Sequence, residues 1–453
     1  MKSKTDILSF TYSSRGRDVD IVEPVLSKLE KDLDITITRK WLYDNFVFDI
    51  LKYRPKLVID ANAIGCRNHL WACRFASMMG CKVVTFVSEG DYRYIDGSIT
   101  TMLFGWNTKE RLYEDLHLEW SQRNIEYFKT SKGYDNNKIK LSGATGFDKY
   151  SLLSFMDRQS LLSKYKKDKF TKVVTLAGYT FDFMFNENHS TGPIYFGKEL
   201  EGIKASLFAL QDGYLELVKN NPDILFVAKK HPLTENKNYD EFSKIEKFKN
   251  VLILQTEENV FDVINVCDIL IAFESTTALE AWLLKKHTLL YNPIIQKFNR
   301  SSISEGSPII ENIENLQKAI DEYYSTGGIK LFADKENDRL KIIKDVIGFA
   351  DGKNYQRAAA YIEDLYLNKQ KNKIEFSFFF FIHMIILGTR NYLRDLIVNT
   401  KIFRRFARVN HFYLRTLNDY TDIERIKYKG IYSKAIDLSL IHISEPTRRS
   451  YIS

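Results

Sequence analysis

The sequence is poor in cysteine and lacks a long uninterrupted apolar run. Its 453 residues include four cysteines, Cys66, Cys73, Cys81 and Cys267. They form no CxxC pair and accompany no paired histidines, which argues against a structural zinc site and for a reducing cytosol. No run reaches the roughly 18 apolar residues of a membrane-spanning helix. The N-terminal residues 1–12 contain no apolar core long enough for a signal peptide.

Positive charge is concentrated in one segment of the chain. The formal net charge is +8, and residues 369–415 contain ten Lys or Arg against two acidic residues, Glu375 and Asp395. The rest of the chain is therefore about neutral. A partner that recognises positive charge must be sought for this segment rather than for the whole protein.

Strand and helix patterns alternate through the first three quarters of the chain. Short apolar runs that predict strands occur at 6–12, 35–38, 56–61, 82–88, 138–142, 172–177, 223–229, 251–256, 268–273 and 287–293. Segments of helical periodicity separate most of them, which is typical of parallel βαβ units. We therefore expect an α/β protein with two Rossmann-like domains, 1–150 and 151–350, on either side of a cleft.

Only helices are predicted after residue 350. A helical segment covers 351–437 and includes the fifteen residues 374–388, which are mostly apolar and rich in phenylalanine. Together with the flanking cations, this block favours an anionic membrane surface as the partner of 369–415. A core helix packed under the two domains and a nucleic-acid-binding stretch are the alternatives; the aromatic block suits a phosphate backbone poorly.

The last residues resemble a sequencing artefact. Residues 438–448, LSLIHISEPTR, resemble the in-frame translation of a transposase adapter used in sequencing libraries. An ordinary polar tail is the alternative. We expect residues 438–453 not to be native, and such segments are excluded from fold prediction.

One predicted strand ends in an unusual polar group. The run 224–228 is apolar, and Lys229, Lys230, His231 and Pro232 follow it directly. Pro232 cannot donate to a sheet ladder, so strand pairing stops there. Ligands of open α/β sheets bind beyond the carboxyl ends of the strands. The pattern predicts a cationic, hydrogen-bonding tip for a negatively charged ligand, although a lone histidine is often structural.

Three consecutive hydroxyl residues follow another predicted strand. Ser275, Thr276 and Thr277 come after the run 268–273 and immediately before a helix. Hydroxyls and free amides at such a position favour a phosphate group. The alternative is a capping box formed by Thr277 and Glu280, which needs one hydroxyl and one acid. The strand 172–177 ends at Gly178, which we place with the phosphate-binding residues.

A carboxylate stands at a third strand end. The strand predicted at 82–88 is followed by Glu89 and Gly90, and the glycine allows a sharp turn. Glu89 could take a proton from an attacking hydroxyl. A solvated acid in a turn is the alternative.

Together the three motifs resemble bacterial GT-B transferases that build surface polysaccharides. Glu89–Gly90, the Lys-His-Pro group and the later hydroxyl run are similar to motifs of sialyl- and polysialyltransferases, capsule Kdo transferases and, more remotely, CDP-glycerol glycerophosphotransferases. The resemblance covers about residues 1–345 and includes the strand and glycine turn at 138–150. Sialyltransferase-type enzymes usually have two acids before the glycine, whereas Ser88 occupies the first of these positions.

The resemblance implies a role for each residue. His231 and the hydroxyls Ser275, Thr276 and Thr277 would bind the nucleotide phosphate, Glu280 a ribose hydroxyl, and Glu89 would act as general base. The implied reaction is inverting transfer of a sugar, from a CMP-linked donor, to a glycan or lipid-linked acceptor. It requires no metal or other cofactor and no nucleic acid. The implied location is the cytoplasm, at the inner face of the cell membrane.

Three other functions fit the same pattern. A CDP-glycerol or CDP-ribitol phosphotransferase would transfer an alcohol phosphate in place of a sugar. A sugar-nucleotide epimerase shares the two-domain layout. An inactive scaffold of a polysaccharide assembly complex would have the fold without the chemistry.

Overall fold

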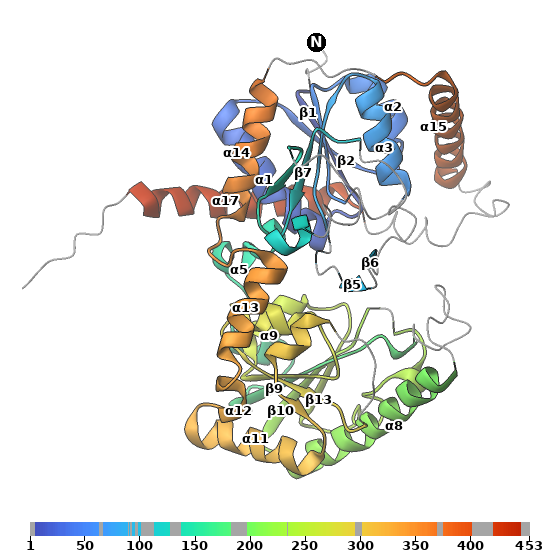
Figure 1. The fold of residues 1–453 in the computed structure, drawn as a ribbon. Coiled ribbons are helices and arrows are strands. Elements are labelled where there is room, and N and C mark those ends of the chain that lie inside the picture. The colour runs from blue at the N-terminus through green and yellow to red at the C-terminus, as the bar shows by residue number, and fades with distance from the viewer. Residues whose placement is uncertain are drawn as a thin grey trace, which may run out of the picture. The chain divides into compact units, whose positions relative to one another are not determined.

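The chain forms two compact units, each built on a parallel sheet (Figure 1). The structure, a computed structural model, describes residues 5–62, 67–88, 90, 93–95, 98–100, 113–126, 137–182, 197–232, 234–294, 301–368, 375–400 and 420–444. Unit 1 comprises Met1–Leu153 and Lys344–Ser453, and unit 2 comprises Ser154–Ile343. Unit 2 is thus an insertion between two parts of unit 1.

Unit 1 contains a six-stranded sheet in the order β2-β1-β3-β4-β7-β8, with every neighbouring pair parallel. Its strands are β1 (Ile7–Thr11), β2 (Ile37–Trp41), β3 (Leu57–Asp60), β4 (Lys82–Thr85), β7 (Leu116–Glu119) and β8 (Ile139–Leu141). A separate antiparallel pair, β5 (Arg93–Ile95) and β6 (Ser98–Thr100), follows β4. The sequence patterns did not predict β5, β6 or β7.

Helices cover both faces of the unit 1 sheet. They are α1 (Arg17–Leu33), α2 (Phe46–Tyr53), α3 (Arg67–Met78), α5 (Lys149–Leu152), α14 (Asn354–Leu367), α15 (Phe378–Asn399) and α17 (Asp422–Ser444). One buried cluster joins the sheet to α1, α14 and α17, and another joins the opposite face to α2, α3 and α15. The apolar character of the central strands β1 and β3 follows from this, because both faces of these strands are buried.

Unit 2 repeats the design with its own sheet, in the order β11-β10-β9-β12-β13-β14. The strands are β9 (Lys172–Ala177), β10 (Ile224–Lys229), β11 (Val251–Leu254), β12 (Ile269–Ala272), β13 (His287–Tyr291) and β14 (Ile309–Ile310). The helices are α6 (Arg158–Lys164), α8 (Gly197–Asn220), α9 (Val260–Val266), α10 (Thr277–Leu283), α11 (Ile313–Thr326), α12 (Lys330–Ala333) and α13 (Glu336–Ile347), which ends in unit 1. The cores lie on the two faces of the sheet. Each unit is therefore Rossmann-like, and the prediction of a two-domain α/β fold with C-terminal helices is confirmed.

The C-terminal helices belong to unit 1 rather than to a segment of their own. On α17, the Tyr432 hydroxyl donates to Asp20 Oδ1 of α1 at 2.7 Å, and both side chains are buried. On α14, the Tyr355 amide donates to Asp148 Oδ2 at 2.6 Å. The helices α14, α15 and α17, which we expected within a third segment, 351–437, therefore share the cores of unit 1.

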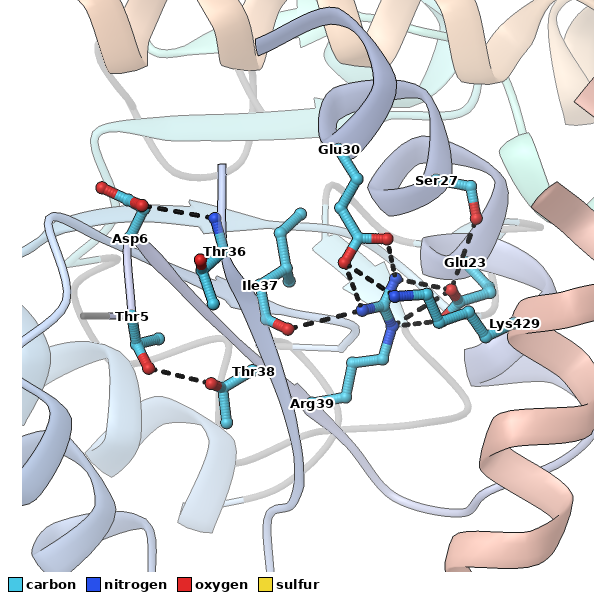
Figure 2. A network of polar contacts seen from close by, with 10 residues as sticks. All are labelled: Thr5, Asp6, Glu23, Ser27, Glu30, Thr36, Ile37, Thr38, Arg39 and Lys429. Carbon is cyan, nitrogen blue, oxygen red and sulfur yellow. Dashed lines mark hydrogen bonds and ion pairs between the residues drawn. The ribbon is translucent and has the colours of Figure 1, made fainter. Parts of the chain in front are cut away.

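An ion-pair network with a buried centre, Arg39 and Glu23, joins α17 to the edge of the unit 1 sheet (Figure 2). Arg39 on β2 donates to both oxygens of Glu23 and of Glu30, with distances of 2.7 to 3.1 Å. Lys429 on α17 donates to Glu30 Oε1 at 3.0 Å. Buried charges are tolerated when they are paired and hydrogen-bonded, as they are here. Removal of Arg39 alone would leave the buried Glu23 without its cation.

The phenylalanine-rich helix is longer than predicted. The apolar run 374–388 ended at Gly388, but α15 continues to Asn399. A Cβ atom at Gly388 would lie 3.1 to 3.2 Å from side-chain atoms of Phe48 and Val47 on α2. The glycine allows α15 to approach α2 closely and does not end the helix. None of the helices that the structure describes is long and apolar enough to cross a membrane.

Candidate functional site

The polar groups predicted in unit 2 lie at the carboxyl edge of its sheet, on neighbouring strands. Lys229 of β10 is level with Ala177 of β9, and Ala177 is level with Ala272 of β12. Strands are about 4.8 Å apart, so the ends of β10 and β12 are about 10 Å apart. His231 and Glu274 each follow two residues later. The strand ends thus bring His231, Gly178 and the hydroxyl run to one edge, where α/β sheets bind ligands.

Gly178 is needed because the backbone after β10 passes directly against it. A Cβ atom at position 178 would lie 2.8 Å from the His231 amide nitrogen and 3.0 Å from the Lys229 carbonyl oxygen. The Gly178 amide donates to that carbonyl at 2.8 Å, which extends the β9–β10 pairing by one step. Gly178 therefore sets the position of the loop that carries His231.

His231 is a neutral side chain at the edge of the site. Burial lowers the pKa of His231 to about 4, so the imidazole carries no charge near neutral pH. Neutral imidazole has one N–H donor and one acceptor nitrogen. An anion near the ring would favour its protonated form and raise this pKa. The group can therefore donate to a phosphate oxygen, and it can gain a proton when a dianion arrives.

Two acidic side chains shape the loops around His231. Asp182 Oδ2 accepts hydrogen bonds from the amides of Glu235 and Asn236 at 2.6 and 2.8 Å. Glu241 Oε1 accepts from the amide of Tyr179 at 2.6 Å. Both carboxyl groups are buried, and burial raises the pKa of Glu241 to about 8. They join the loop after β9 to the chain that follows β10.

The two lysines of the Lys-His-Pro group have partners within unit 2. Lys229 Nζ donates to the carbonyls of Gln255 and Glu258 at 2.5 and 2.7 Å. Lys230 Nζ forms ion pairs with Asp240 and Glu246 at 2.5 and 2.9 Å. The partners of Lys229 follow β11 in the sequence and those of Lys230 precede it, so both ammonium groups are already bound within unit 2. Pro232, which comes after His231, is exposed. We therefore assign no phosphate contact to either lysine or to Pro232.

The hydroxyl run is arranged differently from a capping box. Thr277 is the first residue of α10, and its amide donates to Ser275 Oγ at 3.1 Å. The Ser275 and Thr277 hydroxyls are 2.5 Å apart. Thr276 occupies the N-cap position, but its side chain makes no capping hydrogen bond and is exposed. The interpretation of Thr277 as the capping residue is wrong, because Ser275 accepts that bond.

Glu280, one turn into α10, has one carboxylate oxygen that is not hydrogen-bonded to the described part of the chain. Its Oε2 atom is buried and has no hydrogen-bond partner in the part of the chain that the structure describes. An unpaired buried carboxylate oxygen is costly. A hydroxyl donor from a ligand would satisfy it, as the resemblance implied for a ribose.

Glu89 lies outside the described residues, but its neighbours are placed. Ser88 is buried after β4, and its amide lies 3.5 Å from Asn62 Oδ1. A Cβ atom at Gly90 would lie 2.4 Å from the Trp120 ring, so this glycine is required by packing. The basic residues 369–374 and 401–419 are likewise outside the described part.

A buried pair at the end of β3 was missing from the sequence prediction. His69 Nδ1 lies 2.5 Å from Asp60 Oδ1, which also accepts from the Asn62 amide at 2.8 Å. The signal that could have revealed it is an apolar strand, 57–59, that ends in Asp60. In the described residues, no group of three His, Cys, Asp or Glu side chains is placed to hold a metal ion.

The sequence matches no family model and no curated protein. Solved structures are similar in fold. A Listeria monocytogenes protein that carries the provisional name UDP-N-acetylglucosamine 2-epimerase is 12% identical, with a TM-score of 0.54, over 83% of this chain and 100% of that one. Staphylococcus aureus MnaA, solved with UDP, is 14% identical with a TM-score of 0.53, over 82% and 100%. The UDP-GlcNAc 2-epimerase of Methanocaldococcus jannaschii is 15% identical with a TM-score of 0.50, over 79% and 99%. These likenesses establish the two-domain GT-B fold.

Proposed function

We propose that this chain is an enzyme of nucleotide-linked sugars and that unit 2 binds the nucleotide phosphate. The observation that carries the proposal is the arrangement of His231, Gly178 and Thr276 at the ends of three neighbouring strands. His231 supplies a neutral donor that can become charged, and Thr276 an exposed hydroxyl without a capping role. The buried Oε2 of Glu280 accepts a ribose hydroxyl.

The first candidate reaction is epimerisation of a UDP-linked sugar. Two of the similar solved structures carry that activity in their names, and a third was determined with UDP. This supports a uridine donor over the cytidine donor that the motifs suggested. Epimerisation requires no acceptor, so it can be tested with donor alone.

The second candidate is sugar transfer to a surface polysaccharide, the function that the motifs suggested. It is favoured by one feature of unit 1, the outward side of α15. Phe378, Phe379 and Ile386 are more than half exposed there, and Phe379 is 87% exposed. Monomeric soluble proteins seldom expose a contiguous patch of this kind. A transferase that works on a lipid-linked acceptor would need such a contact with the membrane.

Charge supports an anionic membrane as the partner of this side of α15. The inner side of the helix is covered by unit 1, where Met384 is buried and Phe381 stacks against Phe75. The sequence before and after α15 is basic, with Lys369, Lys371 and Lys373 on one side and five Lys or Arg in 401–415 on the other. Each cation near an anionic leaflet contributes about 1 kcal/mol. The helix would lie in the membrane interface.

Incubation of the purified protein in D2O with UDP-, CDP-, CMP- and GDP-linked sugars, and with CDP-glycerol, tests the proposal. An epimerase gives a new sugar diastereomer and, if it removes and returns a carbon-bound proton, deuterium at the inverted carbon in NMR spectra. A transferase releases nucleotide faster when a glycan acceptor is added, and an alcohol-phosphate transferase releases CMP from a CDP-alcohol. If no donor is bound or turned over, the proposal is wrong, and the inactive scaffold is the remaining alternative.

Sedimentation with vesicles tests the membrane contact. Phe379→Glu with Ile386→Glu should abolish binding to vesicles that contain phosphatidylglycerol. Phe208→Glu with Leu340→Glu replaces apolar residues of unit 2 that are also more than half exposed, and this pair should not affect vesicle binding. If wild-type protein ignores these vesicles and light scattering shows a dimer that the α15 variant loses, the exposed side binds a second copy and the membrane proposal is wrong.

A further inference from the structure

The sheet of unit 1 has a topological switch point between β1 and β3. Its strand order places β2 on one side of β1, and β3 with β4 on the other. The helix that follows β1, α1, packs on one face of the sheet, and the helix that follows β3, α3, packs on the opposite face. The chain therefore leaves these two neighbouring strand ends in opposite directions. Ligands of open α/β sheets bind at such a point.

Three polar side chains meet at the switch point. Asp60 is the last residue of β3 and is level with Phe10 of β1. Asp18 lies in the first turn of α1, and His69 lies in the first turn of α3. His69 Nδ1 is 2.5 Å from Asp60 Oδ1. Burial raises the pKa of Asp18, against the effect of the nearby His69 and together with that of Asp60, so the three groups influence one another.

One oxygen atom of Asp60 is left over by the fold. The Asp60 side chain has no exposed area. Its Oδ1 atom accepts from the Asn62 amide at 2.8 Å and also contacts His69. Its Oδ2 atom is buried and has no hydrogen-bond partner among the residues that the structure describes. An unpaired buried acceptor costs free energy that a donor from a ligand would recover.

The C-terminal part of the chain covers the other side of β1 at this edge of the sheet. The Thr421 amide donates to Ser14 Oγ, in the loop after β1, at 3.0 Å. The Tyr420 ring stacks on Trp41, at the end of β2, with 6.0 Å between the ring centroids. The chain itself therefore occupies the β2 side, whereas the polar cluster with the unpaired oxygen lies on the β3 side.

The chemistry of the cluster favours a neutral donor as its ligand. Two carboxyl groups repel an anion, and a charged group is costly to bury. Burial favours the neutral form of Asp18, which keeps some exposed surface through which a ligand can reach the cluster. A hydroxyl group carries no charge, and it can donate to Asp60 Oδ2 while it accepts from the protonated carboxyl of Asp18. Sugars present several such groups.

We propose that Asp60 and Asp18 form a site in unit 1 for a sugar hydroxyl, which donates to Asp60 Oδ2, and that His69 holds the Asp60 carboxyl in place. The inference rests on the proposed function for the class of ligand, and it adds a site on the other unit. The hydroxyl belongs either to the sugar of a nucleotide-linked donor or to a glycan acceptor. Both sources offer the same chemistry, and the experiment distinguishes them.

Two variants change the acceptor oxygens and keep the size of each side chain. Asp60→Asn replaces the Oδ2 acceptor by an NH2 donor and retains the other oxygen. Asp18→Asn retains an acceptor for the Tyr12 amide, which donates to Asp18 Oδ2 at 2.9 Å. Asp115→Asn is the matched control, because Asp115 also accepts from a backbone amide, that of Val83 at 2.8 Å, but precedes β7 at the amino edge of the sheet.

Calorimetry with UDP, CMP, UDP-GlcNAc and CMP-linked sialic acid measures the donor, and a glycan array without nucleotide measures the acceptor. We expect Asp60→Asn to weaken sugar binding about tenfold and Asp18→Asn several-fold. The Kd values for free UDP and CMP should not change, and Asp115→Asn should bind every ligand as the wild type does. A loss confined to the nucleotide-linked sugars identifies the donor, and a loss confined to glycans identifies the acceptor.

Wild-type affinity of a folded Asp60→Asn variant for every sugar would overturn the proposal, because the unpaired oxygen would then hold no more than a water molecule. It would also be overturned if the wild type binds no glycan and binds nucleotide-linked sugars no more tightly than free nucleotides. If circular dichroism shows that Asp60→Asn is unfolded, Asp18→Asn decides the outcome. Failure of the proposed function has a different signature: free nucleotides would not bind, while glycan binding and its loss in Asp60→Asn would remain.

Discussion

The backbone nitrogen of His231 lies too close to Gly178 for any other residue to occupy position 178 without a clash. A Cβ atom on Gly178 would be 2.8 Å from that nitrogen. The ends of β9 and β10 are thus in direct backbone contact at Gly178. Because the obstacle is backbone, relief requires movement of the loop that carries the imidazole.

Replacement of Gly178 by alanine should therefore displace His231. We expect a loss of about 1–3 kcal/mol in the stability of unit 2, the usual cost of overpacking, and weaker nucleotide binding. Gly328→Ala is the control, because nothing lies within 4 Å of a Cβ atom there. Thermal unfolding and calorimetric titration with UDP measure both effects. An unaltered Kd in Gly178→Ala would show that this strand end is not part of the site.

His231→Ala should lower turnover by about 10², the scale of a lost proton donor or electrostatic contact. The fold should stay intact, because Asp182 and Glu241 hold the surrounding loops through backbone amides. His287→Ala provides the matched control: His287 is also in unit 2 but begins β13, at the opposite edge of the sheet. Steady-state rates with a donor that the wild type turns over measure the effect. Equal rates for the two variants would show that His231 is not part of the site.

The neighbouring hydroxyls should separate stability from affinity. Ser275→Ala removes the acceptor of the Thr277 amide and should cost about 1 kcal/mol of stability. Thr276→Ala removes an exposed hydroxyl that caps nothing, so its melting temperature should stay within error while nucleotide affinity falls several-fold. Denaturant unfolding and calorimetry make the comparison. The phosphate assignment of Thr276 is wrong if its variant binds nucleotide as the wild type does.

Glu241 should make unit 2 less stable as pH rises. Burial raises its pKa from the model-peptide value of 4.5 to about 8 in the folded chain. The folded state thus keeps a proton that the unfolded state has lost, so the contribution of Glu241 to stability is greatest below about pH 4.5 and falls until about pH 8. Glu241→Gln retains an acceptor for the Tyr179 amide and does not titrate. The stability of this variant should be flatter than that of the wild type between about pH 5 and 8, as measured by urea unfolding. A wild-type slope in Glu241→Gln would assign the pH dependence to another group.

Several strands that the sequence predicted are buried on both faces. β9, β10 and β12 are mostly apolar, so no partner needs to be known to identify them. β7 was missed because two of its four residues are His117 and Glu119, which satisfy each other inside the core. A strand with buried polar residues has the same composition as a strand at the surface, so the sequence alone does not distinguish the two.

The candidate site was predicted in its location but less well in its contacts. The strand-end positions of His231 and Ser275 follow from where apolar runs stop. The partners of Lys229 and Lys230 come from residues 240–258, which the local pattern cannot indicate. The sequence likewise indicated Thr277 as the capping residue, whereas α10 begins at Thr277 and the amide of this residue donates to Ser275 Oγ.

The insertion of unit 2 within unit 1 has a consequence for synthesis on the ribosome. Residues 154–343 emerge as one continuous stretch and contain every strand of their own sheet. The first 153 residues cannot complete their hydrophobic core until late in translation, because the helices that cover one face of their sheet include α14 and α17, which are translated after unit 2. During that interval Asp20 lacks Tyr432, and Glu30 lacks Lys429. Unit 2 is therefore the first unit whose residues have all been translated, whereas the complete sheet of unit 1 lacks the helices α14 and α17 on one face until the end of synthesis.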